Sequence, residues 1–359
     1  MFRGTLRTQE RPIGLEVRDH TVRLLQLAQQ GERLKAIAAA EVALPDNTPP
    51  TAPQYPASLR QALRTALERG GFVGTSVVSC LPHASLTCKN FRLPPMPGDE
   101  LRAAVQWEAD DRFRLGGPSS VQYLYAGEVS QGDEQRLELI VMASRLAEIE
   151  AHVDALTDNQ LRPLAIDAPP TALAHLLAGL PQPAAADQGR VLLEIDQDVS
   201  RVLILRDQRI LFYKTIDIAG RQLDSQLAAG LKLPLDQAAA RRRELAHASR
   251  SDDANVQAIL APALQNLGRE IALCLRYFGV TFRGTRPDQA HLLGQAATPW
   301  LAQQLSETSG IDVQLQDPLH GIDLAAVRHL IPAGAEPAWA VAAGLSLRPH
   351  RSTFRRGAA

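Results

Sequence analysis

The stretch that decides the fold is "IGLEVRDHTVRLLQL", residues 13–27. Two apolar runs, residues 13–17 and 21–27, flank a short charged turn, and this pattern predicts a β-hairpin. A phosphate-binding turn after a first strand usually carries glycine, because a residue without a Cβ lets backbone N–H groups approach the phosphate closely. Here the turn carries Arg18 and Asp19 instead. The hairpin therefore raises a choice between a nucleotide-driven machine and a scaffold.

The same pattern returns later in the chain. The segment "RVLLEIDQDVSRVLILRDQRILFYKTIDIAG", residues 190–220, again contains three consecutive β-like runs. Glu16 aligns with Glu194 and Arg23 with Arg201, and both pairs share one offset of 178 residues (16 to 194, 23 to 201). A spacing this long does not describe solenoid repeats. It predicts two related domains, each starting with a hairpin whose turn faces a common cleft.

Composition excludes several classes of protein. The 359 residues are 45% apolar, enough to bury the cores of two or more domains. A formal net charge of −1 leaves no overall basic footprint, so we expect no nucleic-acid partner. The three cysteines lack metal or redox spacing, which is typical of a reduced intracellular compartment. No run approaches the roughly 20 apolar residues that cross a bilayer, which predicts a soluble or at most peripheral protein.

Motifs of ordinary enzyme chemistry are missing from the sequence. The nine histidines show no His-x-x-x-His spacing, and we assign no metal ligand. There is no P-loop, no Gly-x-Ser-x-Gly and no Gly-x-Gly-x-x-Gly after a strand, so we assign no catalytic residue. Arg241, Arg242 and Arg243 lie in a polar helical segment and predict a solvated helix face.

Between the two repeats the chain has the pattern of a compact α+β unit. A helix follows Pro97, a strand follows at residues 136–144, and a second helix places Leu146, Ile149, Val153 and Leu156 on one stripe. The strand-then-helix pattern of the first domain resumes after this unit, so we interpret the unit as an insertion. Near the end, "AWAVAAGLSL", residues 338–347, predicts a closing helix of small residues.

Several segments together resemble a known family. The most specific is "LPPMPGDELRAAVQWEADDRF", residues 93–113, in which a Pro-Met-Pro entry leads into a Trp-Glu-Ala helix. Further matches are "IGLEV" at 13–17, "IAGRQLDSQLAAGLKLP" at 218–234, "GREIALCLRYF" at 268–278 and "SGIDVQLQDPL" at 309–319. These segments resemble the type IV pilus assembly protein PilM family of the actin-like ATPase superfamily, which is related to the cell-division protein FtsA.

The resemblance implies an α/β actin-like ATPase fold with two related domains facing a central cleft and an α+β insertion in domain one. The assigned ranges are 12–82 plus 163–188 for the first actin-like subdomain, 83–162 for the inserted subdomain, 189–225 plus 286–347 for the second actin-like subdomain, 226–285 for a helical subdomain and 348–359 for a basic flexible tail.

The resemblance also implies a function and a partner. We expect a cytoplasmic scaffold, peripheral on the inner membrane, in a type IV pilus or type II secretion-like assembly platform. Relatives hold the short cytoplasmic N-terminal peptide of a single-span partner, PilN, in a groove between the first subdomain and the insertion. Candidate partner-binding residues are Met96, Trp107 and Phe113, for which core packing is the alternative interpretation.

The basic C-terminal tail suggests a second contact. Arg348, Arg351, Arg355 and Arg356 lie within twelve residues of the chain end. Each basic residue near an anionic leaflet can contribute about 1 kcal/mol, so the tail predicts a contact with a membrane surface.

Actin-like proteins hold ATP with three glycine-bearing turns. The first two read Asp-Ile-Gly in the family, but here they read Glu-Val-Arg-Asp at residues 16–19 and Glu-Ile-Asp-Gln at residues 194–197. The third, Gly-Gly-Gly in the family, reads Gly-Gln-Ala at residues 294–296. The resemblance thus places a degenerate ATP site at five residues: Glu16, Arg18, Glu194, Asp196 and Gly294.

These changes act against a bound triphosphate. A carboxylate such as that of Asp196, about 4 Å from a phosphate, repels it by about 4 kcal/mol at an effective dielectric of about 20. Glu16 and Glu194 on apolar strands need partners, for which Arg18, Arg23 and Arg201 are the candidates.

We therefore expect lost or weak nucleotide binding, no cofactor and no enzymatic activity. Two alternatives stay open. In one, the protein is an active ATPase in which Arg18 grasps a phosphate and the two glutamates hold a hydrated Mg²⁺. In the other, it is a filament-forming FtsA-like protein.

Overall fold

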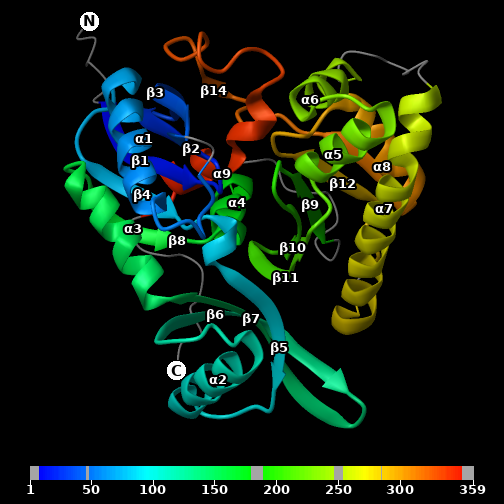
Figure 1. Ribbon diagram of the computed structural model, residues 1–359. Coiled ribbons are helices and arrows are strands. Elements are labelled where there is room, and N and C mark those ends of the chain that lie inside the picture. The colour runs from blue at the N-terminus through cyan, green and yellow to red at the C-terminus, as the bar shows by residue number, and fades with distance from the viewer. Residues whose placement is uncertain (1–7, 46–47, 179–188, 246–253, 284, 350–359) are drawn as a thin grey trace, which may run out of the picture.

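Two sheets form the body of the protein, whose computed structural model describes residues 8–45, 48–178, 189–245, 254–283 and 285–349 (Figure 1). The first sheet has the order β14-β3-β2-β1-β4-β8 and the second the order β11-β10-β9-β12-β13. The strands of the first are β1 (Thr8–Val17), β2 (Thr21–Gln30), β3 (Arg33–Ala43), β4 (Ser76–Cys80), β8 (Arg162–Asp167) and β14 (Ile322–Asp323). Those of the second are β9 (Arg190–Ile195), β10 (Ser200–Arg206), β11 (Arg209–Ile216), β12 (Gln289–Leu293) and β13 (Asp312–Leu315).

The two sheets repeat one topology. In each, three antiparallel strands form a meander, and two parallel strands follow beside the first strand of the meander. The register repeats as well, because Glu16 lies opposite Arg23 just as Glu194 lies opposite Arg201. The duplication predicted from the 178-residue spacing is therefore confirmed.

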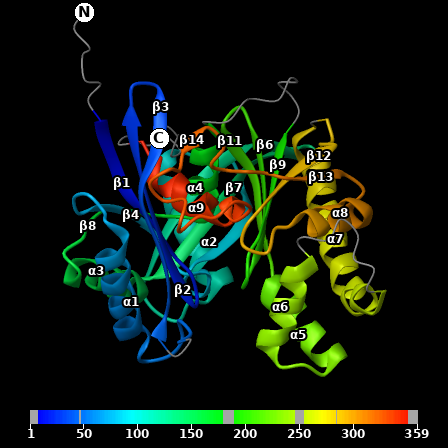
Figure 2. The ribbon, with the colours of Figure 1, turned by 90° about the horizontal axis from the view of Figure 1, so that it is seen from above.

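Helices cover and separate the sheets in layers (Figures 1 and 2). On the outer face of the first sheet lie α1 (Tyr55–Gly70) and α3 (Leu146–Asp158). Between the sheets lie α4 (Pro169–Ala178) and α9 (Ala340–Ser346). On the far face of the second sheet lie α5 (Gly220–Leu231), α7 (Ala254–Phe282) and α8 (Pro299–Ser309), and α6 (Leu235–Glu244) packs on α5.

After β13 the chain returns to the first sheet. Strand β14 pairs with β3, and α9 packs against β1, β2 and α4. The close approach of α9 needs glycine, because a Cβ on Gly14 would lie 2.0 Å from the carbonyl oxygen of Ala342. A Cβ on Gly344 would lie 2.0 Å from the oxygen of Ala172. The range 286–347 assigned to the second subdomain thus includes a segment that packs on the first sheet.

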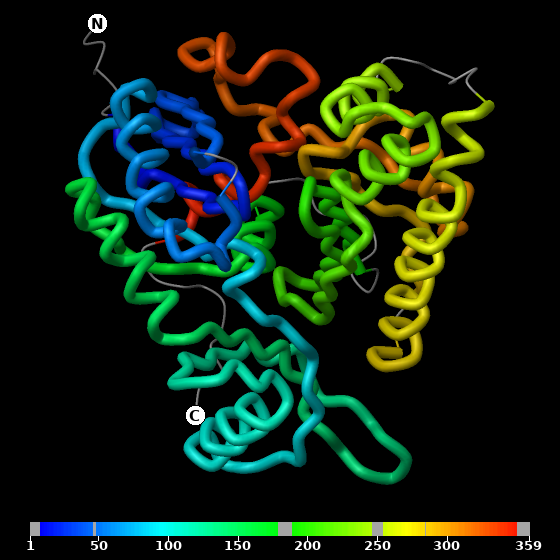
Figure 3. Tube along the Cα trace, viewed as in Figure 1, coloured from blue at the N-terminus to red at the C-terminus, as the bar shows by residue number. Residues whose placement is uncertain are grey.

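The inserted unit is a small sheet covered by one helix. Its strands β5 (Thr87–Leu93), β6 (Ser119–Gln131) and β7 (Glu134–Arg145) have the order β5-β7-β6, and α2 (Gly98–Phe113) packs on one face around a separate core. Figure 3 shows this unit below the two main sheets. The subdomain ranges assigned from sequence stay predictions.

Helix α3 differs from its predicted stripe. Leu156 is buried as expected, but Leu146 is 39% exposed, and the buried face is formed by His152, Ala155 and Leu156. The reason is that α3 lies beside α1 and β8, outside the core of the inserted sheet, although it falls inside the range assigned to the insertion.

The predicted solvated face of α6 is wrong at one position. Arg242 is buried, and its guanidinium donates to both carboxylate oxygens of Asp224 at 2.5 and 3.2 Å. The cause is the packing of α6 onto α5, which carries Asp224. Arg243 is exposed, as predicted. Within the described part of the chain, no helix is both long enough and apolar enough to span a membrane.

Candidate functional site

Three turns meet in the cleft between the two main sheets: residues 16–19 after β1, 194–197 after β9 and 294–296 after β12. The guanidinium of Arg18 forms an ion pair with the carboxylate of Asp196. Its Nη1 also donates to Gln295 Oε1 at 2.6 Å. The two partners in the ion pair occupy equivalent positions of the repeat, 178 residues apart. One side chain thus ties all three turns together.

Each of the two hairpins also has its own buried ion pair. Arg23 Nη1 lies 3.5 Å from Glu16 Oε2, and Arg201 Nη1 lies 2.8 Å from Glu194 Oε2. Arg23 is shared, since it also contacts Glu41 at 2.9 Å. The buried glutamates therefore have the arginine partners expected from the sequence.

Burial dominates the electrostatics of this cluster. One oxygen each of Glu16, Glu194 and Asp196 lies within 4.8 Å of the others. Burial raises the pKa of Glu16 to about 7, although the charges of Arg18 and Arg23 act in the opposite direction. Burial by itself would lower the pKa of Arg18. The negative charges of Asp196 and Glu16 outweigh this effect of burial, so the pKa of Arg18 is raised.

The pocket between the first two turns is small, and its lining includes Glu16, Arg18 and Asp196. The cavity has a volume of about 10 Å³, which is close to the minimum for a single water molecule. Gly294 keeps a positive φ of 100°, and a Cβ there would lie 2.3 Å from the carbonyl oxygen of Ile195. Position 294 therefore requires glycine, because the backbone there packs closely against the end of β9.

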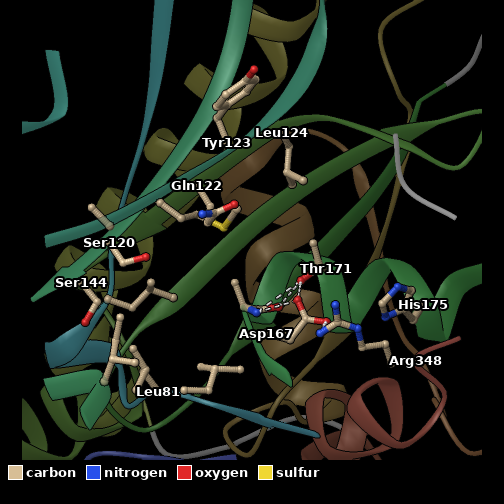
Figure 4. A pocket seen from close by; sticks show the side chains of 16 residues that line it. Leu81, Ser120, Gln122, Tyr123, Leu124, Ser144, Asp167, Thr171, His175 and Arg348 are labelled. Atoms are coloured by element: carbon tan, nitrogen blue, oxygen red, sulfur yellow. Dashed lines mark hydrogen bonds and ion pairs between the residues drawn. The ribbon is translucent and has the colours of Figure 1, made fainter. Parts of the chain in front are cut away.

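A second concavity lies between the inserted sheet and the first main sheet (Figure 4). We call it the β6 groove, and its volume is about 260 Å³. The side chains that line it come from β6, β7, β8, α3, α4 and neighbouring turns: Leu81, Leu86, Ser120, Gln122, Tyr123, Leu124, Met142, Ala143, Ser144, Ile149, Ile166, Asp167, Ala168, Thr171, His175 and Arg348.

A small polar network forms one side of the β6 groove. Asp167 accepts hydrogen bonds from the hydroxyl of Thr171 and from the backbone N–H of Ala168, and it forms an ion pair with Arg348 at 3.1 Å. Figure 4 shows these side chains converging. Arg348, assigned to a flexible tail, is thus bound to the first sheet. The other tail arginines, Arg351, Arg355 and Arg356, lie outside the described residues.

The three predicted partner-binding residues do not line the β6 groove. Met96 and Phe113 pack against the core beneath α2, where the ring of Phe113 lies 5.3 Å from that of Phe91. Trp107 is 68% exposed on α2. Side chains alternate across β6, so Gln122 faces the groove on the side of the sheet opposite α2. Helix α2 and the groove therefore lie on opposite faces of the inserted sheet.

Sequence reasoning missed the groove residues. Asp167 carried the one available signal, since it is a carboxylate at the end of a strand and two residues before a helix that starts with Pro-Pro. The remaining lining residues come from strands, helices and turns, and their meeting depends on how the inserted sheet packs against the first sheet.

Comparison with known proteins decides the family. The profile of the type IV pilus assembly protein PilM family matches residues 14–350. The chain belongs to the PilM family.

Solved structures agree with this PilM-family assignment at the level of the fold. A "PilM-PilN type IV pilus biogenesis complex" matches with a TM-score of 0.76 and 22% identity, covering 94% of this chain and 98% of that one. Ethanolamine utilization protein EutJ from Carboxydothermus hydrogenoformans gives a TM-score of 0.55 at 12% identity, with 96% and 91% covered. MreB 5 of Spiroplasma citri, bound to AMPPNP, gives 0.51 at 9% identity, with 94% of each chain covered. These matches confirm the predicted actin-like α/β fold.

Proposed function

We propose that this PilM-family protein is a scaffold of the type IV pilus assembly platform that binds the N-terminal cytoplasmic peptide of a PilN-like, single-span membrane protein in the β6 groove. The observation that carries the proposal is the place of the groove, between the inserted sheet and the first main sheet. The fold match to a complex of PilM with PilN supports it. Binding this partner would hold the protein on the cytoplasmic face of the inner membrane.

The chemistry of the β6 groove suits a short extended peptide. Leu81, Leu124 and Met142 offer apolar contact, and a concavity of about 260 Å³ has room for a few side chains. The polar side of the groove carries Asp167 already paired with Arg348, so neither charge needs a partner from the peptide. The peptide would therefore bind mainly through apolar side chains, with polar contacts to set its register.

The cleft supports a scaffold over an ATPase. Arg18 stands where the family motif has glycine, and its guanidinium is paired with Asp196 and donates to Gln295. Three carboxylates lie close enough together to hold Mg²⁺. Two of them, those of Glu16 and Glu194, are already paired with Arg23 and Arg201. We infer that nucleotide binding is lost or weak and that no ATP hydrolysis occurs.

A peptide titration tests the partner. Calorimetry with a synthetic peptide of the PilN homologue's N-terminal segment should show binding to the wild-type protein. Gln122→Arg should weaken this binding at least about tenfold, which is about 1.4 kcal/mol of binding free energy, because the larger, charged side chain blocks the groove. Gln131→Arg is the matched control, because both glutamines are exposed on β6 and only Gln122 lines the groove. Equal affinity for both variants would reject the groove as the site.

A second titration tests the cleft. Mg-ATP should give no heat of binding in the micromolar range with the wild-type protein. Micromolar binding that Glu194→Ala abolishes would instead support the active-ATPase alternative. Sedimentation with and without Mg-ATP then tests the filament alternative, which requires nucleotide-dependent growth of large species.

A further inference from the structure

A third concave surface lies along the C-terminal half of α7, and none of its residues belongs to the cleft or to the β6 groove. We call it the α7 groove. It lies between α7, β11 and β5 and has a volume of about 560 Å³. Its walls thus come from the second domain and from the inserted sheet.

The floor of the α7 groove is an uncovered apolar stripe. Leu273, Tyr277 and Val280 follow one another at i, i+4 and i+7, which places them on one face of the helix. Leu273 is 40% exposed and Val280 is 77% exposed. A stripe of this kind beside a concavity is the surface that a partner helix or peptide covers.

The rim of the α7 groove is cationic. Lys214 lies 2.6 Å from Glu270 and remains 42% exposed. Arg276 is exposed, and no carboxylate of the described residues lies within ion-pair distance of it. Arg92 adds a third positive charge, whose carboxylate partner Glu138 is fully buried. The rim therefore presents more positive than negative charge to solvent.

The groove is held in shape by a polar network around the buried carboxylate of Glu138. Arg92 Nε donates to Glu138 Oε2 at 2.7 Å, and its Nη2 donates to Tyr277 Oη at 2.8 Å. Tyr277 Oη in turn donates to Glu138 Oε1 at 2.7 Å. This network joins β5 and β7 of the inserted sheet to α7, so a ligand meets a preorganised surface and loses less entropy on binding.

We propose that the α7 groove docks an acidic amphipathic helix of a protein partner. The apolar side chains of that helix would pack against Leu273, Tyr277 and Val280, and its carboxylates would lie beside Arg276 and Lys214. Charge complementarity argues for an acidic occupant. A second copy of this chain is the alternative occupant that the experiment below distinguishes.

The probe is a capped 18-residue helical peptide with leucine at i, i+3, i+4 and i+7 and glutamate on the flanking positions. Its control is the same peptide with lysine in place of glutamate. By fluorescence anisotropy in low salt, the full chain should bind the glutamate peptide at least about tenfold more tightly than the lysine peptide, because exposed charges interact strongly when screening is weak. Arg276→Glu should weaken binding of the glutamate peptide at least about fivefold.

Arg269→Glu is the matched control variant, since Arg269 is exposed on the same helix, one heptad before Arg276 and outside the groove. With both variants compared at about 0.15 M salt, it should bind the glutamate peptide within about twofold of wild type. The Debye length there, about 8 Å, is shorter than the about 10.5 Å of helix between the two positions. Equal binding of both peptides, no binding, or equal loss in both variants would overturn the proposal. A concentration-dependent dimer in sedimentation velocity that Val280→Glu abolishes would overturn it in favour of a second copy.

Discussion

Replacing Arg18 with alanine should cost the protein about 3–5 kcal/mol of free energy of unfolding, because the variant leaves a buried carboxylate without its partner. Both side chains of the Arg18–Asp196 pair are 6% exposed, so bulk solvent screens the remaining carboxylate only weakly. Gln295 Oε1 also loses its donor, which adds about 1 kcal/mol. Arg112→Ala is the control, since Arg112 is 47% exposed and its pair with Glu108 contributes less than about 0.5 kcal/mol.

A double-mutant cycle isolates the pair. Arg18→Ala and Asp196→Ala should each destabilise the protein strongly. The loss of free energy of unfolding in the double variant should be smaller, by at least about 1.5 kcal/mol, than the sum of the losses in the two single variants. The reason is that each single change removes the same contact. The two residues occupy equivalent positions in the two repeats, so the exchanged variant, Arg18→Asp with Asp196→Arg, should recover part of the loss.

Urea denaturation followed by circular dichroism measures each free energy of unfolding. Additive single effects, within about 0.5 kcal/mol, would refute the reasoning, since independent sites add. An Arg18→Ala variant as stable as the Arg112→Ala control would refute it too, because the ion pair could then not be what holds the three turns together.

Three further changes test the packing. Gly14→Ala should lower the free energy of unfolding by about 1–3 kcal/mol in a urea titration, because its Cβ would lie 2.0 Å from the oxygen of Ala342. Burial lowers the pKa of His152 from 6.5 to about 4. The unfolded state therefore binds this proton at a higher pH than the folded state, and stability should fall by about 3 kcal/mol as the pH drops from 6.5 to 4, a slope that His152→Leu removes in a pH series of melts. Arg242→Ala should cost about 3–5 kcal/mol in thermal unfolding, because Asp224 stays buried without a partner.

Much of the fold followed from local patterns in the sequence. Apolar runs separated by charged turns predicted the hairpin that begins each of the two repeats. The offset of 178 residues, shared by the pairs Glu16/Glu194 and Arg23/Arg201, predicted that the second sheet repeats the first. Local patterns work here because side chains alternate with a period of two along a strand, whatever the strand later pairs with. They failed for α3, since its pattern did not reveal that it packs on α1.

The candidate sites depended on contacts that no local pattern encodes. The sequence by itself determined that charged side chains would stand where a phosphate-binding family has glycine. Only the tertiary structure decided that Arg18 would bind Asp196, its own counterpart in the repeat, and that Gln295 of the third turn would accept a hydrogen bond from the same guanidinium. The tertiary structure also decided that side chains of β6 and Asp167 would line the β6 groove and that Trp107 would be exposed on α2. The physical reason is that these contacts join residues far apart in the chain, and their distances depend on how the sheets pack against one another.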